Sequence, residues 1–130
     1  MFDKGPEFVR GRILFWLGGK EPEGWTLDAD SLDEVLVTQT SLGRLAIGAH
    51  GFALGGQFRA YDEVREVEFM LNPKAAHRRW PWSRPEPKSV AFRLHLIDGA
   101  RLVVTGFPHP SAVFTGVSVM TRLVGAAHAD

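Results

Sequence analysis

The sequence contains no cysteine, no excess of either charge and no long hydrophobic run. Without cysteine, disulfides, thiolate metal sites and a thiol nucleophile are excluded. The 15 basic and 15 acidic residues cancel, so the whole molecule is not attracted to nucleic acid or membranes. The longest early apolar run, Ile13 to Leu17, is far shorter than the about 20 residues of a membrane-spanning helix. The start lacks a signal-peptide pattern, so we expect a cytoplasmic protein.

The remaining composition describes one folded domain. The chain has 130 residues, of which 45% are hydrophobic, a size and content typical of a single globular domain. A chain of this length buries roughly two-thirds of its unfolded surface, so it needs no disulfide or metal to fold. We expect one domain over residues 1–130.

Short apolar runs separated by glycine and proline predict a mainly β protein. In 64–71 and in 90–97, apolar and polar residues alternate, as in strands with one buried face. Asp98-Gly99 between two such runs predicts a hairpin. The segment 8–17 is apolar on both faces and is interpreted as an N-terminal strand that must be covered on both sides. Strands are expected at 8–17, 35–38, 42–48, 52–54, 57–61, 64–71, 90–97 and 101–107.

The C-terminal segment fits both the helical and the strand period. A helix over 111–124 is favoured because Pro110 suits its first turn and Gly125 suits its end. Residues 128–130 are expected to form a frayed tail.

Two segments of opposite charge stand out in the neutral chain. Glu21 to Glu34 contains six acidic residues and no basic one, with Trp25 and Leu27 as anchors to the core. Lys74 to Lys88 contains five basic residues and one acidic residue, a net charge of +4, together with two of the four tryptophans. Its prolines exclude a regular helix or inner strand, so it is predicted to be an exposed loop.

This basic-aromatic segment is the candidate binding site. Arginine pairs with phosphate or carboxylate in bidentate fashion, and tryptophan offers a stacking or membrane-interface surface. In an alternative interpretation the tryptophans cover the core and the arginines pair with the acidic segment. The residues assigned to the site are Lys74, His77, Arg78, Arg79, Trp80, Trp82, Arg84 and Lys88.

The sequence shows no catalytic or metal-binding motif. The histidines at 50, 77, 95, 109 and 128 lack metal-ligand spacing. There is no phosphate-binding glycine loop and no Gly-x-Ser-x-Gly. We therefore expect no enzymatic activity, no metal and no cofactor, and we expect His95 and Asp98 to lie on the surface beside their hairpin.

The order of these segments resembles a pleckstrin-homology-like domain, most nearly the GRAM and bacterial variants. The resemblance covers about residues 36–125. It implies a β-barrel or sandwich of about seven strands with a C-terminal helix that plugs one end. On that basis residues 1–34 form an N-terminal strand and acidic segment, and 35–125 form the barrel and closing helix. The matching residues are Arg44 to Gly48, Phe52 to Leu54, Tyr61 to Phe69, Ser89 to Gly99 and Arg101 to Phe107.

Two functions from different classes follow. The favoured one is a noncatalytic binding module that engages a protein partner or an anionic lipid surface through 74–88, with nucleic acid less favoured. The alternative is an assembly subunit that self-associates through the apolar N-terminal strand.

Overall fold

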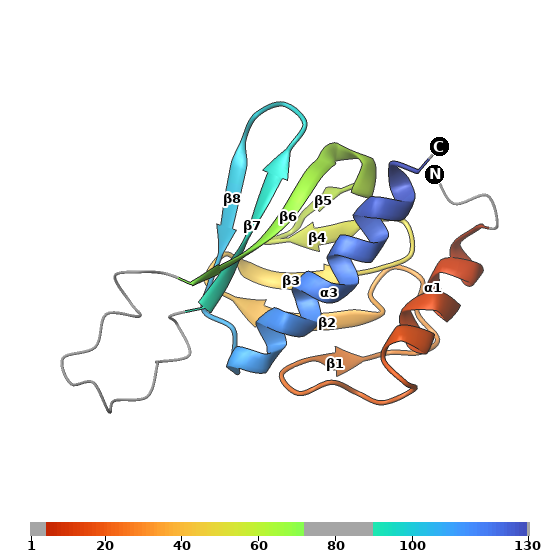
Figure 1. The fold of residues 1–130 in the computed structure, drawn as a ribbon. Coiled ribbons are helices and arrows are strands. Elements are labelled where there is room, and N and C mark those ends of the chain that lie inside the picture. The colour runs from red at the N-terminus through yellow and green to blue at the C-terminus, as the bar shows by residue number, and fades with distance from the viewer. Residues whose placement is uncertain (1–4, 72–89, 130) are drawn as a thin grey trace.

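In the part of the chain that the structure describes, the fold consists of two antiparallel sheets and two α-helices (Figure 1). The computed structural model describes residues 5–71 and 90–129 of the chain. Eight strands lie in these residues, five in one sheet and three in the other. The predicted mainly β class with a C-terminal helix is therefore confirmed. The described strands do not close into one barrel.

The five-stranded sheet has its strands in chain order, β1 to β5. Each strand pairs with the next through a short connection, as in a meander. The first strand, β1, has two residues, lies at one edge of this sheet and is not predicted from the sequence. The strands are β1 (Thr26–Leu27), β2 (Leu36–Thr40), β3 (Gly43–Ile47), β4 (Phe52–Leu54) and β5 (Gln57–Arg59).

The three-stranded sheet contains the strands that the sequence predicts most clearly. These are β6 (Val64–Leu71), β7 (Val90–Leu96) and β8 (Arg101–Val104). The predicted hairpin at Asp98-Gly99 joins β7 to β8, and Gly99 adopts a φ of 92° there, which glycine reaches without strain. A bulge between Val64 and Glu66 bends the start of β6.

A short 3-10 helix, η1 (Tyr61–Glu63), connects the two sheets. The Tyr61 hydroxyl donates to the Gly48 carbonyl at 2.6 Å and to the Gly51 carbonyl at 3.0 Å. These bonds attach η1 to the β3–β4 turn. Burial raises the pKa of the Tyr61 phenol far above its ordinary value, and the bond to Gly48 offsets part of this rise. Tyr61 is therefore a neutral donor in the core.

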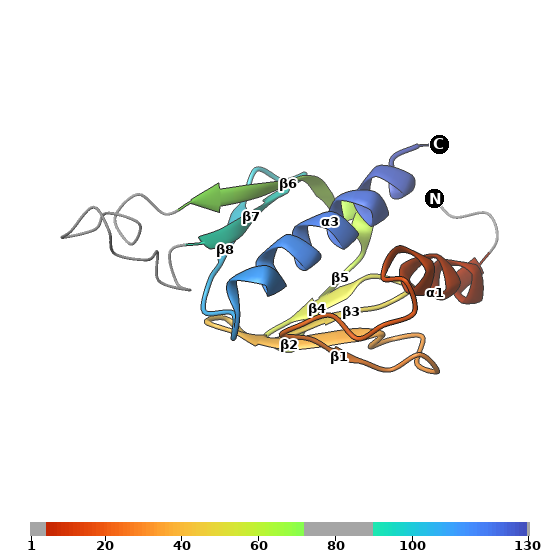
Figure 2. The same cartoon turned by 60° about the horizontal axis from the view of Figure 1, so that its bottom comes forward.

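The C-terminal segment is the helix α3 (Pro110–Ala127), as the proline start predicts. Figure 2 shows α3 lying between the two sheets. The predicted stop at Gly125 is wrong, because the helix continues to Ala127. The predicted frayed tail is also wrong at His128, whose ring hydrogen-bonds the Val64 carbonyl at the start of β6.

The N-terminal segment is the helix α1 (Gly5–Trp16), so the predicted strand at 8–17 is wrong. Proline at the second position and an acidic residue in the first turn favour a helix. The buried residues Val9 and Ile13 are four apart, as on one face of a helix. Gly18 and Gly19 adopt positive φ, and their N–H groups bond back to the last turn, so the chain ends the helix in a Schellman motif.

One core joins both sheets and both helices. Trp25 connects the acidic segment to α3: its Nε1 donates to the Ala112 carbonyl at 3.0 Å. Gly116 gives the Trp25 ring room, because a Cβ there would make a tight contact of 3.1 Å with it. Leu27 packs against the same core. The predicted anchoring of the acidic segment through Trp25 and Leu27 is thus confirmed.

Candidate functional site

The predicted binding residues, from Lys74 to Lys88, all lie outside the described residues. The strands that flank them are described. Leu71 at the end of β6 pairs with Val90 at the start of β7. The segment therefore leaves and re-enters one sheet at neighbouring strands.

Three carboxylates of the acidic segment have partners, two of them elsewhere in the fold and one within the segment. The Glu34 carboxylate pairs with Arg44 on β3. Glu23 lies 3.2 Å from the His109 ring, and Glu21 accepts the Leu27 N–H at 3.0 Å. The contacts of Glu34 and Glu23 attach the acidic segment to β3 and to His109, the residue before α3. The pairing of this segment with the arginines of 74–88 stays a prediction.

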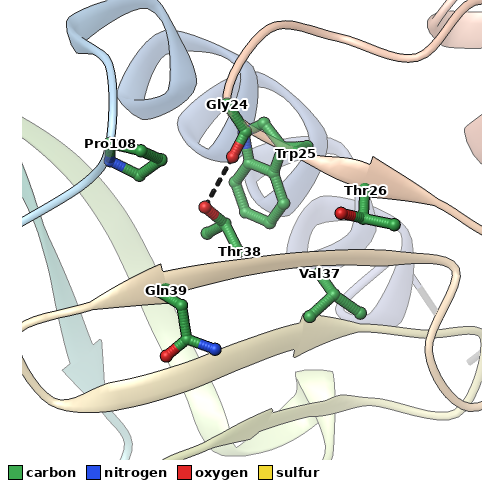
Figure 3. A pocket seen from close by; sticks show the side chains of 7 residues that line it. All are labelled: Gly24, Trp25, Thr26, Val37, Thr38, Gln39 and Pro108. Atoms are coloured by element: carbon green, nitrogen blue, oxygen red, sulfur yellow. Dashed lines mark hydrogen bonds between the residues drawn. The ribbon is translucent and has the colours of Figure 1, made fainter.

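A cleft of about 310 Å³ lies at the edge of the five-stranded sheet (Figure 3). There the Thr38 hydroxyl donates to the Gly24 carbonyl at 2.6 Å and ties β2 to the chain that precedes β1. Val37 and Gln39 extend from the opposite face of β2 to Thr38, as alternation requires. The cleft is lined by Gly24, Trp25, Thr26, Val37, Thr38, Gln39 and Pro108.

The position of this cleft follows from the shortness of β1. β1 pairs only with Leu36 and Val37 of β2. The next backbone contact on this edge is from the Ser41 N–H to the Thr105 carbonyl at 2.8 Å. Between them, no described strand pairs with Thr38–Thr40 of β2 on this side. An uncovered edge beside apolar Val37 and Pro108 suits a short extended peptide or a small polar molecule.

A second polar site crosses the three-stranded sheet on the face away from α3. The Glu68 carboxylate on β6 lies 3.0 Å from His95 Nε2 and 3.4 Å from Arg93 Nη1, both on β7. The hydrogen bond from His95 and the charge of Arg93 hold the pKa of the Glu68 carboxyl below its ordinary value. The Glu68 side chain therefore links β6 to β7 through polar contacts with Arg93 and His95.

The expectation that His95 lies on the surface is wrong, because its exposed fraction is only 9%. β7 is the central strand of its sheet, so His95 is flanked on both sides, by Glu66 of β6 and by Arg101 of β8. His95 Nδ1 and Arg93 Nε are buried and have no hydrogen-bond partner among residues 5–71 and 90–129. Asp98 is exposed in the hairpin as predicted, and its carboxylate accepts the Ala100 N–H.

In the described part of the chain, no cluster of three or more histidine, aspartate or glutamate side chains can hold a metal ion. No described helix has the length and hydrophobicity to cross a membrane. Comparison with known proteins found no matching family model, no matching curated protein and no matching solved structure.

Proposed function

We propose that this protein is a noncatalytic interaction module with a pleckstrin-homology-like architecture. Four strands, β2 to β5, precede three, β6 to β8, and a C-terminal helix follows them. This order supports the proposed architecture. Function is argued separately from the fold, because one fold supports many functions.

The module engages a protein partner or an anionic lipid surface through Lys74 to Lys88. The observation that carries this proposal is the charge of +4 and the two tryptophans within 15 residues of a neutral chain. The flanking residues Leu71 and Val90 belong to paired strands, which hold both ends of the segment at one edge of the fold. Arginine and tryptophan are enriched where proteins bind partners, and basic segments bind anionic membrane surfaces.

Co-sedimentation with phosphatidylcholine vesicles, with and without phosphatidylserine, tests this proposal over a salt series. We expect salt-sensitive binding to the anionic vesicles that an oligonucleotide does not compete away. The variant R78E/R79E/R84E loses this binding, whereas R59E/R65E/R101E, with the same change of charge on described strands, keeps it. If the two variants bind the anionic vesicles equally, the segment 74–88 is not the binding surface.

Self-association through the N-terminal segment is the second candidate. The sequence predicts pairing between apolar strands of two copies, and this is wrong because the segment is helix α1. The observation that keeps self-association as a candidate is the 71% exposure of Phe15 on that helix. Sedimentation velocity of the full chain and of Phe15→Ser tests it: a dimer that becomes a monomer in the variant supports assembly, and a wild-type monomer excludes it.

A further inference from the structure

Helices α1 and α3 lie beside one another and enclose a cleft of about 270 Å³. One wall is the end of α1, and the other is the outward side of α3. The cleft is lined by Trp16, Leu17, Phe114, Thr115, Ser118, Val119 and Arg122. We call this surface, together with Arg12 and Phe15, the helix-pair face.

Two aromatic residues of this face, Phe15 and Phe114, lie outside the core, whereas Trp16 packs partly against it. The inward sides of both helices are already buried, as at Ile13 and Leu123, which are 0% exposed. Phe15 is 71% exposed and Phe114 is 56% exposed. Phe114 stacks on Phe69 at the end of β6, with ring centroids 4.9 Å apart. Phe69 is itself 39% exposed, so the stacked pair places two aromatic rings side by side on the surface, as in apolar patches that bind partners.

The charges of the helix-pair face are all positive. The Arg122 guanidinium lies 5.4 Å from the Trp16 ring centroid, and Arg12 lies 5.8 Å from it. Helix α3 contains no acidic residue, and Arg122 is its only charged residue. Within the described residues, neither Arg12 nor Arg122 has a carboxylate partner. As far as residues 5–71 and 90–129 are concerned, both guanidinium groups therefore have hydrogen-bond donors available to an anionic partner.

We propose that the helix-pair face binds an acidic peptide segment of a partner protein. The segment places an apolar side chain in the cleft, and its carboxylates pair with Arg12 and Arg122. Charge complementarity favours this occupant over a symmetric second copy. A two-fold dimer through this face would bring the same patch of each copy together, and with it Arg12 and Arg122 of both copies.

A charge-swap experiment tests the proposal by fluorescence polarisation. The probe is a labelled peptide of glutamate and aspartate that flank two leucines, and its counterpart has lysine at every acidic position. All proteins carry R78E/R79E/R84E, so that the basic-aromatic segment does not bind the acidic probe. We expect the acidic peptide to bind and the lysine peptide not to bind.

The variant R12E/R122E is expected to reverse this preference, because each interfacial charge pair becomes a repulsion for one probe and an attraction for the other. The affinity for the acidic peptide falls at least about tenfold. The control R59E/R101E carries the same change of charge on β5 and β8 and keeps the preference. Identical binding by R12E/R122E and the control would overturn the proposal.

A second pair of variants tests the cleft without changing charge. Ser118 is exposed on the cleft wall, so Ser118→Phe fills the cleft and Ser118→Ala leaves it open. We expect only Ser118→Phe to weaken the acidic probe, again by about tenfold or more. Equal affinities of the two variants would contradict an apolar anchor in the cleft.

Two other occupants are separate outcomes that overturn the proposal. If R12E/R122E in the otherwise wild-type chain abolishes vesicle binding while no peptide binds, the helix-pair face binds a membrane. If the wild type sediments as a dimer and Ser118→Phe as a monomer, its occupant is a second copy.

Discussion

The two sides of helix α3 have opposite chemistry. The inward side carries Val113, Gly116, Met120 and Leu123, all buried between the sheets. The outward side carries half-exposed Phe114, exposed Ser118 and the only charge of the helix, Arg122. The inward side therefore determines stability. The outward side is free to serve binding, because its side chains contribute little to the core.

The largest effect is expected from truncation of the inward side. Leu123→Ala removes a side chain that is 0% exposed and should lower the free energy of unfolding by about 3 kcal/mol, since it loses burial and leaves a cavity. Phe114→Ala, on the outward side, should cost about 1 kcal/mol through its stacking on Phe69. Urea denaturation of both variants measures the difference. Equal losses would show that the two sides do not differ as described.

A smaller effect is expected where the inward side meets the acidic segment. Trp25→Phe removes the hydrogen bond from Nε1 to the Ala112 carbonyl, 3.0 Å long, and should cost about 1 to 2 kcal/mol. Trp16→Phe is the matched control, because Trp16 is only partly buried. If the control loses as much free energy of unfolding, Trp25 does not anchor the acidic segment as proposed.

The two glycines of α3 sharpen the comparison further. A Cβ at Gly125 meets nothing within 4 Å, so Gly125→Ala should raise the free energy of unfolding by about 0.5 to 1 kcal/mol through helix propensity. At Gly116 a Cβ would lie 3.1 Å from the Trp25 ring, so Gly116→Ala should not stabilise. Thermal unfolding followed by circular dichroism distinguishes the two. Equal stabilisation by the two substitutions would show that the Trp25 ring can shift to accommodate a Cβ at position 116.

The smallest effect is expected on the face of the three-stranded sheet away from α3. The pKa of Glu68 is lower in the folded protein than its ordinary value. The ionised carboxylate therefore contributes to the free energy of unfolding at pH values above the ordinary carboxyl pKa. The contribution is lost as the pH falls through the lower folded pKa. Wild type should therefore lose free energy of unfolding in acid more steeply than Glu68→Gln. Urea titrations from neutral pH down to below about pH 4 compare the slopes, and parallel curves would exclude this role of Glu68.

The sequence predicts those elements that depend on local pattern. Strands 64–71 and 90–97 alternate along their length, and the hairpin at Asp98-Gly99 has its own turn residues, so all three are found. The helix α1 is missed because a short apolar run has no single period. Its true signals are local too: Pro6 before Glu7, the spacing of Val9 and Ile13, and the glycine pair after it.

The candidate sites divide in the same way. The basic-aromatic segment is visible in the sequence because its charges are adjacent, although its residues lie outside the described structure. The helix-pair face joins residues more than a hundred positions apart, such as Arg12 and Arg122 around Trp16. The link between Glu68 and His95 likewise depends on the register of β6 and β7. Only the tertiary packing and the strand pairing bring these groups together.

The central claim is that one module binds through two separate surfaces. Titrating anionic vesicles and the acidic peptide against wild type, R78E/R79E/R84E and R12E/R122E tests it most directly. The first variant should lose the vesicles and still discriminate the acidic peptide from its lysine counterpart. The second should keep the vesicles, and when it is combined with R78E/R79E/R84E it should reverse that discrimination. If each variant loses both ligands to the same extent, or neither loses any, the claim of two distinct binding surfaces is contradicted.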